Sequence, residues 1–216
     1  MPTYHMLLDG SEFHGQIRPA LAASWRLRSF DPCRPLCAAL ASAATSFAAR
    51  CYAGPDQPLV CLVAAGLPFD RHCWRLLVGE MLLFAAAEVP QIETSPETLG
   101  HLLAPGASGP ETVPRQQFSP IDQVHFGARD LVFGGGFYRP DHAGYNDRDD
   151  VARLARYLAE IPADRWTTKD LAGLPDLETE ADREEELAFV REWLPPLQDL
   201  YQRAGDRGQI VACERL

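Results

Sequence analysis

The stretch Leu131–Ile161 reads LVFGGGFYRPDHAGYNDRDDVARLARYLAEI and carries the clearest sign of the fold. Its first three residues are apolar and are followed by a glycine triplet, and we expect these three residues to enter a sheet. Further along, apolar residues recur at three- and four-residue steps, which predicts an amphipathic helix from Asn146 to Ile161. Asn146 is the expected N-cap, acidic residues occupy the first turn, and Pro162 ends the helix.

A second helix and a final strand follow. The spacing of apolar residues predicts a helix from about Glu180 to Ala204, with the acidic run Asp182 to Glu186 near its start. Pro195-Pro196 is expected to bend or break this helix, because a proline removes an amide donor and crowds the carbonyl four residues earlier. The segment from Gln209 to Cys213 is short, β-branched and alternating, which predicts a strand.

The features of this last third occur in a recognisable order. They are the Gly-rich strand end, the Asn/Asp-capped helix from Asn146, an acidic spacer with Leu174-Pro175-Asp176-Leu177, the helix end Leu197–Ala204, and the strand from Gln209. This order resembles the YfbM-like family over roughly residues 127–214. The resemblance implies a bacterial protein of α+β fold. It transfers no functional residue, because that family is one of unknown function.

The first half of the chain gives four further elements. Tyr4 to Leu8 is expected to be a strand, and an alanine-rich helix is expected from Pro32 to about Tyr52. Leu59 to Ala64 is a continuous apolar run, short enough to be a buried strand. Asp70 is expected to cap a strongly apolar helix from Arg71 to Glu88, whose Trp74 should lie in the core.

Two short helices and one loop complete the prediction. Ser95-Pro96 and Ser119-Pro120 are typical helix starts, for helices ending near Leu103 and Phe126. Between them, residues 104–114 are rich in glycine and proline and are expected to form a flexible internal loop. We therefore predict a single α+β domain over residues 1–216, in which helices cover a small, mostly antiparallel sheet of about four or five strands.

Composition limits the classes of partner. The chain has 216 residues, 46% of them hydrophobic, and a formal net charge of −10. An acidic surface disfavours binding to nucleic acid and to anionic membranes, and it permits a basic protein partner. No apolar run approaches the length of a membrane span, and residues 1–5 show no secretory pattern, so we expect a cytoplasmic protein. The sequence predicts no cofactor and leaves the oligomeric state open.

Six cysteines raise the question of a disulfide framework or a metal site. They are Cys33, Cys37, Cys51, Cys61, Cys73 and Cys213. No Cys-x-x-Cys occurs, and Cys33 with Cys37 is an i, i+4 pair on a predicted helix. A mixed site with His72-Cys73 is the alternative, but reduced core cysteines are the favoured interpretation, and no metal site is predicted.

Residues 134–146 are the candidate catalytic region. Gly134-Gly135-Gly136 is either a sharp bend or an anion-binding turn, and the missing dinucleotide-binding spacing favours the bend. Asp141 and His142 are an acid–base pair if the protein is a small hydrolase or transferase, and together with the acids after Asn146 they are a weaker metal candidate. A second acid–base candidate is Glu12 with His14, which share one face if that segment is extended.

Trp25 is the main candidate for an interaction surface. It lies beside two cations in Ser24-Trp25-Arg26-Leu27-Arg28, and an exposed aromatic residue beside arginines is typical of interfaces. The predicted binding residues are thus Trp25, Arg26 and Arg28, together with the glycine triplet 134–136. The leading hypothesis is a non-enzymatic protein-binding module that masks a basic protein such as a toxin or nuclease. The alternative is the enzyme with Asp141 and His142.

Overall fold

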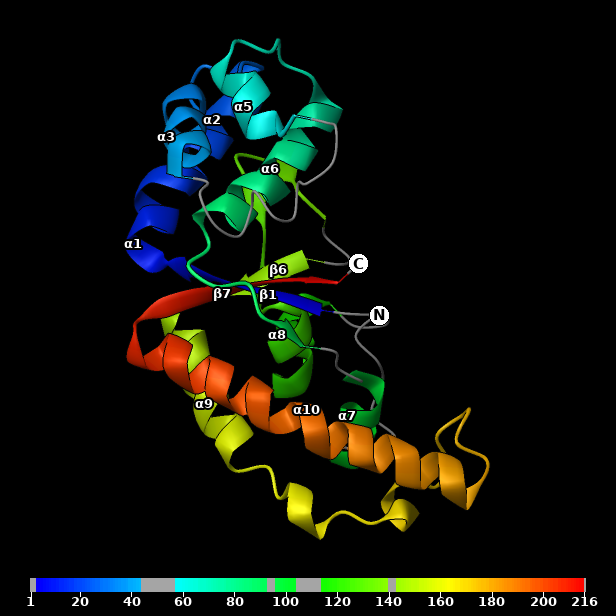
Figure 1. Ribbon diagram of the computed structural model, residues 1–216. Helices are drawn as coiled ribbons and strands as arrows, with labels where there is room; N and C mark the ends of the chain where they lie inside the picture. Colours follow the sequence, from blue (N-terminus) through cyan, green and yellow to red (C-terminus); the bar gives the residue numbers. More distant parts are fainter. Residues whose placement is uncertain (1–2, 44–56, 93–95, 104–113, 140–142, 216) are drawn as a thin grey trace.

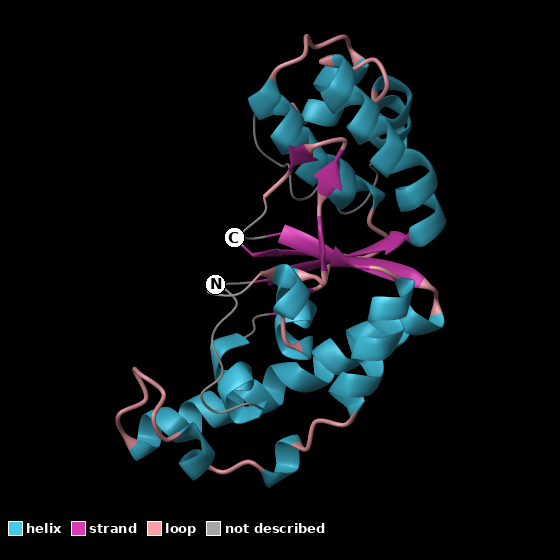
Figure 2. Cartoon of the chain, turned by 180° about the vertical axis from the view of Figure 1, so that it is seen from behind, coloured by secondary structure: helices cyan, strands magenta, loops and turns pink. Residues whose placement is uncertain are grey.

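The computed structural model describes residues 3–43, 57–92, 96–103, 114–139 and 143–215. A central sheet lies between two layers of helices (Figure 1), and the same layering is visible from behind (Figure 2). The predicted α+β class, with helices around a small antiparallel sheet, is confirmed.

The sheet has five strands in the order β2-β1-β7-β6-β3. They are β1 Thr3–Asp9, β2 Gln91–Ile92, β3 Arg129–Asp130, β6 Ala143–Asn146 and β7 Gln209–Arg215. All neighbouring pairs are antiparallel, and β1 pairs with β7 over its whole length, from Thr3 opposite Arg215 to Asp9 opposite Gln209. The predicted first and last strands are therefore the two central partners of the sheet.

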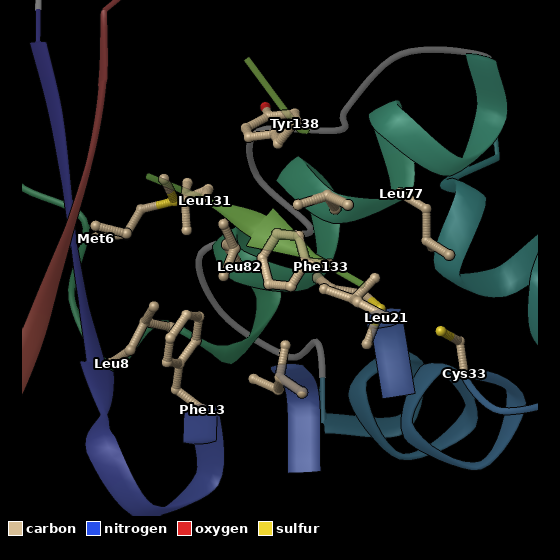
Figure 3. Close-up of a cluster of buried hydrophobic side chains, with 14 of the residues drawn as sticks. Met6, Leu8, Phe13, Leu21, Cys33, Leu77, Leu82, Leu131, Phe133 and Tyr138 are labelled. Carbon is tan, nitrogen blue, oxygen red and sulfur yellow. The ribbon is translucent and has the colours of Figure 1, made fainter. Parts of the chain in front are cut away.

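Both faces of the sheet are buried, which explains why its central strands are almost continuously apolar. Met6 and Leu8 point into one hydrophobic cluster, and Leu7, between them, points into another. Figure 3 shows the first cluster, where Leu8 lies beside Phe13, from the helical segment that follows β1, and Met6 extends toward Leu131. We call these the upper and the lower core, following Figure 1.

The upper layer covers the core of Met6 and Leu8. It contains α1 Gly10–Glu12, a π-helical turn Phe13–Ile17, α2 Arg18–Leu27, α3 Arg34–Ala43, α5 Leu59–Ala64 and α6 Arg71–Ala85. Asp70 caps α6 as predicted, because its carboxylate accepts from the amides of His72 and Cys73 at 2.8 and 2.9 Å. Trp74 is completely buried, which confirms the predicted core helix.

The lower layer covers the core of Leu7. It contains α7 Pro96–Leu103, α8 Pro120–Phe126, α9 Arg148–Ala159, the long α10 Glu180–Asp206, and the 3₁₀ turns Arg115–Gln117, Ala163–Arg165 and Thr168–Leu171. Ser119 caps α8 as the Ser-Pro pattern predicts. Trp166 and Trp193 are both buried in this core.

Two predicted features differ from the structure, and a third is described only in part. Leu59–Ala64 is the helix α5 and not a strand. A six-residue apolar run fits either state. The helix is favoured here because the buried Glu80 carboxylate accepts a hydrogen bond from the Val60 amide at 3.0 Å, which satisfies one of the free donors at the helix start. The N-cap of α9 is Asp147, because Asn146 is the last residue of β6. Of the helix predicted over 32–52, the described part is α3; residues 44–52 lie outside the described residues.

The prolines do not break α10 into two segments, which was one of the two outcomes predicted for them; the other outcome, a bend, stays a prediction. Pro195 and Pro196 lie within the continuous helix Glu180–Asp206, and both are exposed. The carbonyls that lose a donor belong to Arg191 and Glu192, which are exposed as well. Water can therefore satisfy these carbonyls, while Trp193, Leu194 and Leu197 keep the helix packed on the core.

Leu131–Phe133 was expected to enter the main sheet, but it does not. Val132–Phe133 (β4) pairs with Gly136–Phe137 (β5) in a separate two-stranded hairpin. The hairpin packs into the upper layer through Phe133, whose ring lies 6.2 Å from that of Trp74. Among the described residues, no helix is both long and apolar enough to cross a membrane.

Candidate binding surfaces

The structure brings together the two groups of predicted binding residues. Gly134 and Gly135 form the two-residue turn of the β4–β5 hairpin, and both have positive φ, 60° and 91°, as a type I′ turn requires. The third glycine, Gly136, lies directly against Trp25, where an added Cβ would be only 2.6 Å from the ring. The triplet is thus a sharp hairpin turn whose last residue supports the tryptophan.

Trp25 is half-buried and stacked, not freely exposed as the sequence had suggested. Its ring lies 4.7 Å from that of Trp74, tilted by 49°. The guanidinium of Arg28 lies over the Trp25 ring at 4.1 Å, and that of Arg71 is 5.9 Å away. The indole is therefore held between the core and two cations, in an arrangement that favours cation–π attraction.

Two exposed arginines, Arg28 and Arg71, lie against this stack, and two more exposed arginines, Arg26 and Arg75, are close to them in the chain. Arg26 and Arg28 come from the end of α2, and Arg71 and Arg75 lie one turn apart at the start of α6. None of them forms an ion pair within the described residues. Beside them Leu27 is 68% exposed, the largest value among the exposed large apolar residues. We call Trp25, Arg26, Arg28, Arg71 and Arg75 the arginine surface.

A second surface has the opposite charge. Residues 164–192 contain ten acidic and four basic residues, a net charge of −6 within a chain of net charge −10. This segment includes two 3₁₀ turns and the first half of α10, and in Figure 1 it extends beyond the sheet at the lower right. We call residues 164–192 the acidic arm.

Many carboxylates of the acidic arm are already used by the fold. Asp170 and Asp182 cap helical segments through Thr167 and Thr179, and these hydrogen bonds lower the pKa of both carboxyls. Glu180 accepts from Thr168 and pairs with Arg183, which lowers its pKa as well. The exposed carboxylates that have no such partner are Asp164, Asp176, Glu178, Glu184, Glu185 and Glu192.

The two surfaces lie on opposite faces of the sheet. Trp25 and Trp74 pack on the core of Met6 and Leu8, above the sheet in Figure 1. The acidic arm packs through Trp166 and Leu187 on the core of Leu7, below the sheet. The four arginines of the arginine surface and the six unpaired carboxylates of the acidic arm therefore lie on opposite sides of the sheet.

The predicted catalytic pair, Asp141 and His142, lies outside the described residues, and its role stays a prediction. The acids that follow it serve the fold. The Asp147 carboxylate accepts from the amides of Asp149 and Asp150, and Arg129 pairs with Asp147 at 2.6 Å and with Asp150 at 2.8 Å. These two carboxylates are therefore neutralised by a cation, which leaves little negative charge for a metal ion.

The buried polar side chains around Cys213 resemble a catalytic cluster in composition only. Tyr201 donates to the carbonyl oxygen of Val124 at 2.8 Å, and the Cys213 thiol and His5 Nε2 contact the same oxygen at 3.4 and 3.2 Å. This carbonyl lies in the last turn of α8, where no intrahelical donor exists. Burial raises the pKa of Cys213 to about 12 and lowers that of His5 to about 3. The thiol is thus protonated and the group caps a buried helix end.

The remaining acid–base and thiol candidates are not assembled into a site. Glu12 and His14 lie in a helical segment rather than an extended one, so the two residues do not share a face. Cys33 precedes α3 in a turn, although it is buried together with Cys37. The described cysteines 33, 37, 61, 73 and 213 are free thiols, while Cys51 lies outside the described residues.

Comparison with known proteins gives one structural likeness. No protein-family model and no curated protein matches the chain. Among solved structures, the chain is similar to the crystal structure of YfbM from Escherichia coli, a protein of unknown function. The TM-score is 0.46 and the identity 14%, over 99% of this chain and 98% of that one. A likeness of this degree says nothing about ligands or activity.

Sequence reasoning missed two of the four arginines of the arginine surface. Arg71 and Arg75 follow Trp25 by 46 and 50 residues in the chain, and only the packing of Trp74 against Trp25 brings α6 beside the end of α2. The one available signal was the i, i+4 spacing of Arg71 and Arg75, which places both on one face of the predicted helix.

Proposed function

We propose that this chain is a non-enzymatic protein-binding module whose partner is a basic protein, of the toxin or nuclease kind. The observation that carries the proposal is the set of six exposed, unpaired carboxylates in the acidic arm. Like charges held close together repel one another, and this repulsion lowers the stability of the unbound protein. A basic partner would remove that repulsion on binding and would be attracted from a distance.

The arm is also built as a firm platform for such a partner. Leu171 is completely buried, and Trp166 and Leu187 are nearly so, so that both 3₁₀ turns and the first half of α10 are fixed to the lower core. Thr98 of α7 donates to Glu186, and Arg191 donates to the Trp166 carbonyl at 2.6 Å. A fixed set of carboxylates loses little conformational entropy when it binds, which favours recognition.

The test compares two charge-neutralised variants as baits for proteins of the host cell. The arm variant carries Glu178→Gln, Glu184→Gln and Glu185→Gln. The control variant carries Glu12→Gln, Asp149→Asn and Glu160→Gln, which removes three carboxylates that have no ion pair and lie outside the arm. Both should melt like the parent chain, since all six positions are unpaired, five are exposed and Glu12 is partly exposed, and surface substitutions of this kind change stability by about 0.5 kcal/mol or less.

We expect the parent and the control variant to retain the same basic protein, and the arm variant to lose it. Retention should weaken as salt is added, because the interaction is between exposed charges. Equal capture by the arm variant, or captured proteins that show no excess of positive charge, would refute the proposal.

A further inference from the structure

The arginine surface has the composition of an interface, and its arginines have no carboxylate partner among the described residues. Among the arginines whose side chains the structure describes, those with neither a hydrogen bond nor an ion pair are Arg26, Arg28, Arg71, Arg75, Arg148 and Arg165, and four of these six belong to the arginine surface. Exposed Leu27 lies among them. Arginine around aromatic and apolar side chains is the residue mixture that protein interfaces favour.

Arg28 is held in a fixed position. It ends α2 with a left-handed backbone, φ 52° and ψ 42°, and its guanidinium stays at 4.1 Å from the Trp25 ring. Stacking on an indole leaves the edge donors of a guanidinium free for carboxylate oxygens. The surface is therefore arranged to receive carboxylates before any ligand arrives.

We infer that the arginine surface of one copy binds the acidic arm of a second copy, so that the protein associates head to tail. The charges are complementary, since four unpaired arginines face outward on one surface and six unpaired carboxylates on the other. One molecule cannot join its own two surfaces, because they lie on opposite faces of the sheet. The arm also offers apolar contacts for Leu27, because Leu174 and Leu177 are only half-buried.

This geometry fixes the kind of assembly. Two different surfaces meet, so each added copy leaves one arm and one arginine surface open, and chains grow or close into rings. The association goes beyond the proposed function, but both use the acidic arm. A basic partner would therefore compete with the second copy for the arm, and its binding would cause the assembly to dissociate.

Sedimentation velocity of the purified full chain tests the inference. At about 0.01 M salt, charges act over ~30 Å, and the weight-average sedimentation coefficient should rise with protein concentration. At about 0.15 M salt and above, charges act over about 8 Å, and the coefficient should become independent of protein concentration. Arg28→Glu with Arg71→Glu should abolish the rise. Because both of these arginines contact Trp25, Arg26→Glu with Arg75→Glu provides a second variant that leaves the stack intact.

Charge reversal on the other side gives the decisive mixture. Glu184→Arg with Glu185→Arg should also be monomeric alone, and mixing it with the Arg28→Glu/Arg71→Glu variant should restore association, because each variant keeps one native surface. Arg148→Glu with Arg156→Glu is the control of equal charge change and should associate like the parent chain. A parent chain that is monomeric at low salt, arginine variants that still associate, or a mixture that stays monomeric would each overturn the inference. The proposed function is tested separately, since the Arg28→Glu/Arg71→Glu variant keeps its acidic arm and should still capture the basic partner.

Discussion

The contact between Gly136 and the two tryptophans gives the sharpest prediction. A Cβ at Gly136 would lie 2.6 Å from Cδ2 of Trp25 and 2.8 Å from a ring carbon of Trp74. Carbon atoms normally approach to about 3.5 Å at closest, so Gly136→Ala demands a shift of roughly 0.7 to 0.9 Å between rigid rings. Overpacking of this kind costs about 1–3 kcal/mol, and we expect the upper half of that range because Trp74 is fully buried and cannot yield.

Gly135→Ala is the matched control. Gly135 has φ 91° but nothing within 4 Å of its Cβ position, so an alanine there carries only the backbone cost of about 1–2 kcal/mol. Urea unfolding measures both free energies, and the tryptophan emission spectrum should shift for Gly136→Ala alone, because only that variant displaces Trp25. If the two variants were equally stable with unchanged emission, the Trp25–Trp74 stack would not rest on the hairpin, and the account of the arginine surface would be wrong.

Three further predictions concern the cores. Trp74→Ala should lower the free energy of unfolding by about 3–5 kcal/mol, whereas exposed Leu76→Ala on the same helix should change it by about 0.5 kcal/mol or less, as thermal or urea unfolding will show. Burial, followed by the charge of His125, lowers the pKa of His5 from 6.5 to about 3, so between these pH values the unfolded chain binds a proton at His5 and the folded chain does not. The free energy of unfolding should therefore fall by on the order of 4 kcal/mol as the pH drops from 6.5 towards 3. Urea unfolding at several pH values should show a smaller loss for His5→Gln. Burial raises the pKa of the Cys33 and Cys213 thiols to about 11 and 12, so native alkylation followed by intact-mass analysis should label neither, and rapid labelling of Cys213 would contradict the buried helix cap.

Elements with a local signal could be predicted from the sequence. Asp70 before an apolar stretch and Ser119-Pro120 before another gave the starts of α6 and α8, because caps satisfy donors that every helix start leaves free. The strands β1 and β7 followed from β-branched and apolar runs. Their pairing with each other could not be predicted, since about 200 residues separate them in the chain.

Elements decided by distant contacts were missed. Leu59–Ala64 is a helix partly because Glu80, from another helix, caps it, and nothing within the six residues carries that information. The prolines of α10 are tolerated because both happen to lie on its solvent side, which depends on where the lower core sits. Trp25 looked exposed beside two arginines, yet Trp74 and Gly136 cover it from parts of the chain far away.

The same reasoning changes what the net charge of −10 means. At physiological salt a charge acts over about 8 Å, so a carboxylate on the acidic arm does nothing to neutralise an arginine on the other side of the sheet. Each surface therefore presents its own sign to a partner: the arm is strongly anionic, and the surroundings of Trp25 are cationic although the chain is acidic. An argument from net charge alone predicts a basic partner for the whole molecule. The distribution of charge limits that expectation to the arm, while the cations of the arginine surface attract a ligand rich in carboxylates.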